Sequence, residues 1–187
     1  MAYFERLENP RYELIDGEER MLAQPSMNHA RIARNLMFII QGYLKGKRCE
    51  VFGEVDVYFD ESNHYVPDIV VVCDRDKMKF DGVYGAPDLV VEILSPSTGK
   101  RDVGIKKEAY ERFGVREYWI VNPKEKSIEA YHLRDGKFVL DDRYTVLEDY
   151  EERMLNEKEK AEHRLTLKVS LYDDLEIDVR EVFEDMT

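Results

Sequence analysis

Two stretches of the chain have the apolar spacing of amphipathic helices. In residues 26–46, "SMNHARIARNLMFIIQGYLKG", apolar side chains recur at every third or fourth position, namely Ile32, Leu36, Ile39, Ile40, Tyr43 and Leu44. Ser26 is a suitable N-cap for this helix, and Gly46 can end it. A second helix is predicted over 102–114, with an apolar stripe that ends before a glycine and consists of Ile105, Ala109 and Phe113.

The strand patterns are of two kinds. Residues 67–73, 87–95 and 115–123 are apolar at successive positions, which is typical of central strands that helices cover on both faces. A further strand is predicted over 49–59. Hairpins are predicted around the Asp-Gly pairs at 16–17 and 135–136, and a strand with a short helix over 165–183. Together these elements predict an α+β or mixed α/β fold with a central sheet between helices.

The composition fits one folded domain. The 187 residues suit a single domain, 1–187, with a sizeable core, and 43% hydrophobic and 36% charged residues are typical of a soluble protein. No apolar run approaches the roughly 18 residues of a membrane span, and the charged N-terminal segment does not resemble a signal peptide. Cys49 and Cys73 lie far apart without a CxxC pattern, so we expect buried free thiols in a cytoplasmic protein.

The net charge of −12 lowers the expectation of nucleic-acid binding, because an acidic chain repels phosphates overall. A local basic patch or bound metal ions can overcome this repulsion. The acidic run 147–164 is expected to be a solvated loop or helix away from any site. The stretch "STGKRD" is not a phosphate-binding P-loop, since Leu94 stands where that motif requires its first glycine.

Two carboxylates occupy positions where an isolated charge would be costly. Asp68 begins the strand "PDIVVV", and Glu92 lies within the apolar strand "PDLVVEILS", so each needs a partner. Lys106, one turn into the following helix, can reach back across the edge of the sheet. Asp102 and Tyr110 lie four residues to either side of Lys106, on the same helical face.

Two acids and a lysine suit metal-assisted hydrolysis of a phosphodiester. Carboxylate oxygens suit a hard cation such as Mg²⁺, which polarises the phosphate, and a lysine can orient the attacking water and stabilise the developing charge. The alternative is a buried salt bridge between Lys106 and either Asp68 or Glu92. Residue spacing alone leaves both interpretations open.

Several segments together resemble the Uma family of restriction endonucleases, within the PD-(D/E)XK nuclease superfamily. They are "YELIDGE", "NHARIARNL", "YVPDIVVV", "APDLVVEILSPST", "DVGIKKEAYERFGVREYWIVNP" and "YDDLEIDVREVF", which cover most of the chain. The resemblance implies a restriction-endonuclease-like core with a central mixed β-sheet flanked by helices, Mg²⁺ dependence and cleavage of DNA. It also implies that Asp68 and Glu92 are the metal-binding acids.

The lysine departs from the superfamily pattern. It normally lies two residues after the glutamate, where this chain has Leu94. In the Uma family it is found on the following helix, which matches Lys106. The adjacent Lys107 points about 100° around the helix and is the weaker candidate. Lys100 and Arg101, in the segment before this helix, could instead contact phosphate.

Three further residues are secondary candidates. His29 matches the family's histidine in the first helix, and could contact the site or a phosphate, or make a structural hydrogen bond. Glu54 could be an additional metal ligand or lie on a solvated strand face. Tyr110 could donate a hydrogen bond in the site or pack as an aromatic residue.

The functional hypothesis is a Mg²⁺-dependent DNA endonuclease in which Mn²⁺ can substitute for Mg²⁺. In this hypothesis Asp68 and Glu92 bind the metal, and Lys106 assists the attacking water. The expected partners are DNA and a second copy of the chain, because cleavage of both DNA strands favours two active sites related by a twofold axis. The alternative is a catalytically inactive module of the same fold that binds a protein or a nucleic acid. A glycoside hydrolase is disfavoured, because nothing in the sequence indicates an open sugar cleft between the acids.

Overall fold

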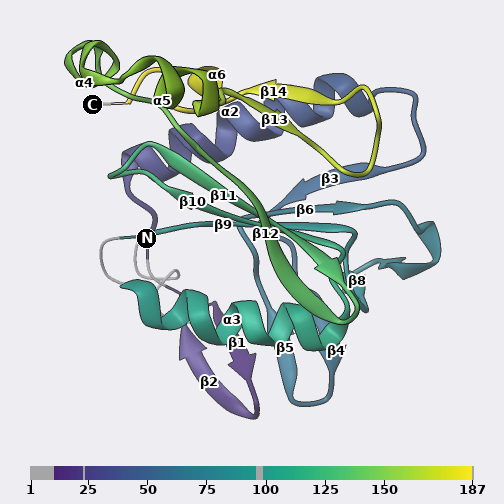
Figure 1. Cartoon of the computed structure of the whole chain (residues 1–187). Helices are drawn as coiled ribbons and strands as arrows, with labels where there is room; N and C mark the ends of the chain where they lie inside the picture. The colour runs from purple at the N-terminus through teal and green to yellow at the C-terminus, as the bar shows by residue number, and fades with distance from the viewer. Residues whose placement is uncertain (1–10, 23, 96–98, 187) are drawn as a thin grey trace, which may run out of the picture.

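A computed structural model describes residues 11–22, 24–95 and 99–186, with the side chains of 99–103 outside that description. Its main element is a six-stranded central sheet with the order β12-β11-β10-β9-β6-β3 (Figure 1). These strands are β3 (Glu50–Gly53), β6 (Ile69–Val72), β9 (Leu89–Ile93), β10 (Glu117–Asn122), β11 (Ser127–Arg134) and β12 (Lys137–Thr145). Only β9 and β10 pair in parallel, so the sheet is mixed.

A second sheet of six strands has the order β2-β1-β5-β4-β8-β7. Its strands are β1 (Tyr12–Ile15), β2 (Glu18–Met21), β4 (Val57–Asp60), β5 (Asn63–Tyr65), β7 (Met78–Lys79) and β8 (Gly82–Tyr84). The β1–β2 turn is the predicted hairpin, and Asp16 and Gly17 both adopt the positive φ that such a tight turn requires. The same holds for Asp135 and Gly136 between β11 and β12.

Helices cover both faces of the central sheet. They are α2 (Met27–Leu44), α3 (Gly99–Phe113), α4 (Asp149–Met154), α5 (Glu157–Glu162) and α6 (Val179–Val182), with a 3₁₀ turn η1 (Arg75–Lys77). On one face lie α2, α6 and a hairpin of β13 (Thr166–Lys168) and β14 (Glu176–Asp178), and on the other lies α3 (Figure 1). Ser26 caps α2 as predicted, because its hydroxyl oxygen accepts a hydrogen bond from the backbone N–H of His29.

The central sheet separates two apolar cores. Val71, Val91 and Trp119 face the core beneath α2, whereas Val70, Val90 and Tyr118 face the core that α3 shares with the second sheet. Strands with apolar residues on both faces are therefore central, as their sequences predict. This mixed α+β arrangement confirms the predicted fold class.

Two details of the predicted strands were wrong. The stretch 49–59 is not one strand, because it divides into β3 of the central sheet and β4 of the second sheet. Glu54, which follows β3, has φ +49°, a conformation that ends the extended strand. The C-terminal stretch holds a two-stranded hairpin as well as the short helix α6.

The expectation of free thiols was also wrong, because Cys49 and Cys73 form a disulfide. The antiparallel register of β3 and β6 pairs Glu50 with Val72, and therefore brings the two flanking cysteines face to face. Cysteines far apart in the chain need no CxxC motif when strand pairing brings them together. The disulfide also removes one of the observations behind the expected cytoplasmic location, because disulfides are rare in that compartment.

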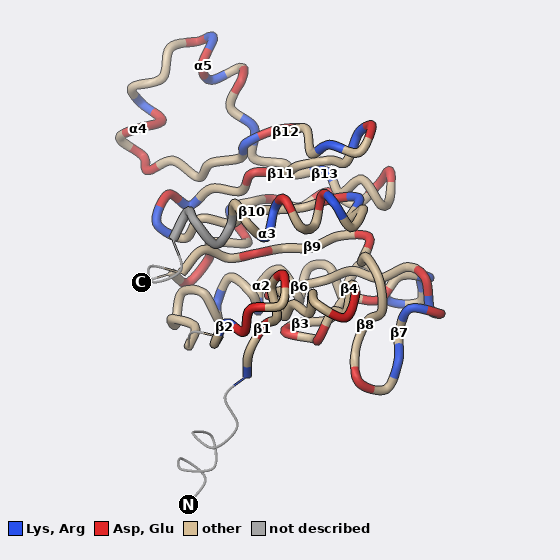
Figure 2. The backbone as a smooth tube through the Cα atoms, turned by 90° about the horizontal axis from the view of Figure 1, so that it is seen from below, with Lys and Arg blue, Asp and Glu red and all other residues tan. Residues whose placement is uncertain are grey.

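The acidic run 147–164 forms α4 and α5 and lies away from the residues predicted to form a site. Both helices have no buried residue, and Figure 2 shows acidic and basic residues interspersed along them. This confirms that the run is a solvated surface feature. Within the part of the chain that the structure describes, no helix is long and apolar enough to cross a membrane.

Candidate active site

Asp68 lies immediately before the first residue of β6, which is an internal strand of the central sheet. Both of its carboxylate oxygens accept hydrogen bonds. Oδ2 accepts from the backbone N–H of Ile93 at 2.6 Å, at the end of the neighbouring strand β9. Oδ1 lies 2.9 Å from Nε2 of His29, on α2. These contacts fix the Asp68 carboxylate beside the residue that follows Glu92.

A second Pro-Asp pair in the chain makes a similar backbone contact. Asp88 precedes β9 as Asp68 precedes β6, and its Oδ2 accepts from the backbone N–H of Cys73 at 2.8 Å. Because the two strands are antiparallel, each aspartate binds a backbone amide at the end of the other strand. The backbone contact alone therefore does not mark a catalytic residue. Asp68 differs in lying next to Glu92.

Glu92 lies near the end of β9 and is 8% exposed, on the face of the central sheet that α3 covers. Its Oε1 accepts two hydrogen bonds, from the Tyr110 hydroxyl at 2.6 Å and from the Lys106 ammonium at 3.0 Å. Within the described residues no donor contacts its Oε2. Tyr110 is fully buried, so it both packs in the core and donates in the site.

Lys106 connects Glu92 to a carboxylate of the second sheet. Its ammonium lies 2.7 Å from Oε1 of Glu13, on β1, and 3.0 Å from Oε1 of Glu92. Glu13 is itself 4% exposed, and the same oxygen accepts from the backbone N–H of Val66 at 2.9 Å. The lysine is thus held by carboxylates from two sheets.

The pKa of Glu92 is raised, mainly because burial disfavours the charged carboxylate. The positive charge of Lys106 lowers this pKa, whereas the negative charges of Asp68 and Glu13 raise it further. Burial alone would lower the pKa of Lys106, but Glu92 and Glu13 more than offset that effect, and the pKa is raised. Lys106 therefore remains a cation. One ammonium is shared among a group of carboxylates, which leaves the site with excess negative charge.

His29 adds a second group of positive character. Burial tends to lower its pKa, but the hydrogen bond and the charge of Asp68 outweigh burial, and the pKa is raised. Its other ring nitrogen, Nδ1, is buried, and none of the described residues forms a hydrogen bond with it. The structure thus places His29 beside Asp68, while α2 and α3 approach this site from opposite faces of the sheet.

The remaining candidates have different surroundings. The backbone N–H of Glu54 donates to the carbonyl of Asp68 at 3.2 Å, and the charge of Glu54 helps to raise the pKa of His29. Its side chain is 55% exposed and pairs with Arg11 at 3.1 Å, so Glu54 lies beside the buried cluster and not within it. Lys107 points away, with its ammonium 3.4 Å from the centre of the Tyr131 ring. The side chains of Lys100, Arg101 and Asp102 lie outside the described residues.

Asp68 and Glu92 could hold a metal ion as an open site. Among the described residues, no group of three or more His, Cys, Asp and Glu side chains is arranged to enclose a metal. Mg²⁺ is commonly held by one or two carboxylates, with water and substrate phosphate at its other positions. Two adjacent carboxylates in a site of excess negative charge fit such an ion.

Glu13 was missed in the sequence. The alternation in "YELI" suggests that Tyr12 and Leu14 face the core, but the structure buries Glu13 and Ile15 instead. The sequence around Glu13 does not indicate that this glutamate is buried. Its burial could be inferred only after the fold had placed Lys106, 93 positions away, next to it.

The chain is similar to proteins of one family. The family model described as "Uma2: Putative restriction endonuclease" matches residues 1–170. The uncharacterized protein slr1290 of Synechocystis sp. is 31% identical over 136 residues, which are 71% of this chain and 71% of that protein. A crystal structure of "a putative nuclease belonging to DUF820" from Anabaena variabilis has the same fold, with a TM-score of 0.71, 21% identity, and coverage of 93% of this chain and 90% of that one. By the family model, which covers most of its length, the chain belongs to the Uma2 family.

Proposed function

We propose that this protein is a Mg²⁺-dependent DNA endonuclease whose active site consists of Asp68, Glu92 and Lys106. The observation that carries the proposal is the link between them: Asp68 binds the amide next to Glu92, and Glu92 binds the Lys106 ammonium. Membership of a family described as restriction endonucleases supports nuclease chemistry.

Each side chain has a role in this proposal. Asp68 and Glu92 hold the cation, which when bound polarises the scissile phosphate. Lys106 orients the attacking water and stabilises charge on the phosphate oxygens. Tyr110 and Glu13 position the Glu92 carboxylate and the Lys106 ammonium, respectively, because each makes a short buried hydrogen bond to its partner.

The test uses the two Pro-Asp pairs as a matched comparison. Supercoiled plasmid is incubated with Mg²⁺ or Mn²⁺ and with the native protein, Asp68→Asn or Asp88→Asn. Asparagine can still accept the backbone hydrogen bond at either position, so both variants should fold. We expect Asp68→Asn to lose at least about a hundredfold in nicking rate, and Asp88→Asn to cleave like the native protein. Equal activity in all three proteins would reject the proposed site.

A second candidate function is a catalytically inactive module that binds a partner. The observation in its favour is that Lys106 is already paired with two buried carboxylates, which gives the cluster a purely structural use. Calorimetric titration distinguishes the two functions. The nuclease requires Mg²⁺ or Mn²⁺ binding that Glu92→Gln removes, whereas the binding module requires neither.

A further inference from the structure

A pocket lies at the end of β6 opposite to Asp68. It has a volume of about 660 Å³, and the residues around it include Arg48, Cys49, Cys73, Arg116, Arg134 and Tyr172. Cys73 directly follows β6, whereas Asp68 directly precedes it. The pocket is therefore separate from the candidate active site, and the function proposed above makes no use of it.

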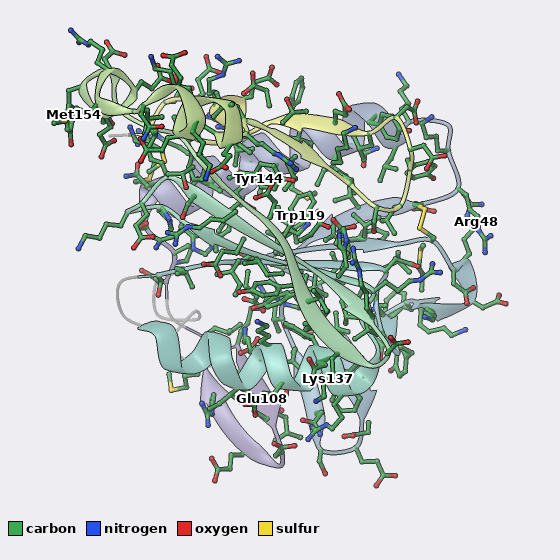
Figure 3. The ribbon with its side chains drawn as sticks, in the orientation of Figure 1. Arg48, Glu108, Trp119, Lys137, Tyr144 and Met154 are labelled. Atoms are coloured by element: carbon green, nitrogen blue, oxygen red, sulfur yellow. A yellow bond between two sulfur atoms is a disulfide. The ribbon has the colours of Figure 1, made fainter. Side chains whose placement is uncertain are left out.

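The lining of this pocket is cationic. The chain has 40 acidic residues, yet among the described residues that line the pocket there are three arginines and no carboxylate. The Nε of Arg48 donates to the carbonyl of Cys73 at 2.8 Å, and Figure 3 shows Arg48 beside the disulfide. Arg116 and Arg134 are 73% and 61% exposed, so their guanidinium groups are accessible to a ligand.

Two of the three arginines are paired with carboxylates that lie outside the lining. Asp88 lies 3.3 Å from Arg116, and Asp141 lies 3.4 Å from Arg134. His132, which also lines the pocket, lies between Asp141 and the fully buried Glu117. Arg48 donates to a carbonyl, and among the described residues no carboxylate forms an ion pair with it, so its charge is not compensated. An anionic ligand is therefore favoured beside Arg48 and the disulfide.

The disulfide forms part of the pocket wall, and its two sulfur atoms differ in their surroundings. Cys49 is 6% exposed, whereas Cys73 is half-buried, so an incoming group reaches Cys73 more readily. The Tyr172 hydroxyl donates to Sγ of Cys49 at 3.2 Å. This hydrogen bond would stabilise a thiolate on Cys49, and Cys49 is therefore the better leaving group.

We propose that the pocket is a site of thiol–disulfide exchange with small anionic thiols, that is, low-molecular-weight thiols that carry carboxylates. The ligand thiolate attacks Sγ of Cys73. A bond forms between these two sulfur atoms, the Cys49–Cys73 bond breaks, and its electron pair remains on Cys49 as a thiolate. A second ligand thiolate then attacks the ligand sulfur and releases Cys73. Two ligand thiols are oxidised to a disulfide, and the protein disulfide is reduced to two thiols.

The first test compares an anionic thiol with a neutral one. The rates at which 3-mercaptopropionate and 2-mercaptoethanol reduce the disulfide are measured, and their ratio is taken so that general effects of a variant cancel. We expect the double variant Arg116→Gln and Arg134→Gln to lower this ratio about tenfold. The variant Arg153→Gln, on the exposed helix α4, removes a charge far from the pocket and should leave the ratio unchanged. An unchanged ratio in the double variant overturns the proposal.

The second test identifies the attacked sulfur. Protein purified without reductant is treated briefly with 3-mercaptopropionate, its free thiols are alkylated, and the peptides are analysed by mass spectrometry. We expect the mixed disulfide on Cys73 and the alkyl group on Cys49. A mixed disulfide on Cys49, or alkylation of both cysteines before any thiol is added, overturns the proposal.

Discussion

The Lys106 ammonium lies 2.7 Å from Oε1 of Glu13, although the two residues are 93 positions apart in the chain. The contact joins α3 to β1, an element of the second sheet. Both side chains are almost fully buried, 12% and 6% exposed, so each compensates a charge that water does not reach. The position of the proposed catalytic lysine therefore depends on the second sheet as well as on its own helix.

Glu13→Gln tests whether this contact positions Lys106. Glutamine keeps the size of the side chain and can still accept a hydrogen bond, but it removes the negative charge from the lysine. We expect nicking to slow about tenfold, with Mg²⁺ affinity nearly unchanged, and the free energy of unfolding to fall by about 1–3 kcal/mol. Nicking rates, calorimetry and urea unfolding measure the three quantities.

Glu18→Gln is the matched control, since it lies in the same hairpin with a side chain that is 79% exposed. It should change neither the rate nor the stability. If Glu13→Gln cleaves as fast as Glu18→Gln, Glu13 has no positioning role.

Lys106→Met leaves two buried carboxylates without their cation. We expect the free energy of unfolding at neutral pH to fall by about 3–5 kcal/mol and cleavage to be lost. Lys106 opposes the raised pKa of Glu92, so in this variant the folded protein protonates Glu92 more easily, and the stability deficit should shrink as the pH is lowered. Chemical denaturation at two pH values measures both effects.

Lys107→Met is the neighbouring control. Lys107 contacts the Tyr131 ring, so its loss should cost about 1 kcal/mol, with no marked pH dependence and no loss of cleavage. A Lys106→Met variant that behaves in the same way would show that the buried cluster is not held by charge.

The helix α2 and the central strands β6, β9 and β10 could be predicted from apolar periodicity, because they bury continuous or helically spaced apolar faces. Asp68, Glu92 and Lys106 could be selected as candidates because two charges interrupt apolar strands and require a cation, and the resemblance to the Uma family favoured a metal site over a salt bridge. What periodicity cannot supply is the packing between elements. The burial of Glu13 depends on α3 crossing the second sheet, and the pairing of Cys49 with Cys73 depends on the register of β3 against β6.

The raised pKa of Glu92, to about 7, predicts a pH dependence. A carboxyl group whose pKa is higher in the folded protein than in the unfolded chain stabilises the fold at low pH, and this contribution is lost as the pH rises through the folded value. We therefore expect Tm without metal to decrease as the pH rises from about 4.5, the ordinary value of a glutamate, to about 7, and to level off above that. The decrease should be smaller in Glu92→Gln.

The same titration predicts how a Mg²⁺ ion bound at Glu92 would change the thermal stability. A cation competes with the proton for Glu92, so Mg²⁺ should raise Tm more at about pH 8 than at about pH 6. Thermal unfolding with and without Mg²⁺ measures the difference. An equal increase at both pH values, or the same increase in Glu92→Gln, would place the metal elsewhere.

Removing the disulfide should affect stability and leave metal binding intact. The double variant Cys49→Ser and Cys73→Ser opens a cross-link between residues 24 positions apart, and we expect it to lose about 2–4 kcal/mol of unfolding free energy. Mg²⁺ affinity should be unchanged, because Asp68 lies at the opposite end of β6. Urea unfolding and calorimetry test both statements, and a matching loss of stability on reduction of the native protein is the control.

The most direct test of the proposed active site is the position of a bound Mn²⁺ ion. Crystals of the native protein and of Glu92→Gln are soaked in Mn²⁺, and anomalous difference density is calculated for both. If Asp68 and Glu92 hold the metal, native crystals show a peak at these two carboxylates, with the Lys106 ammonium nearby, and the variant shows no peak there. A peak that survives in Glu92→Gln, or native crystals whose Mn²⁺ lies only at other sites, would exclude this active site.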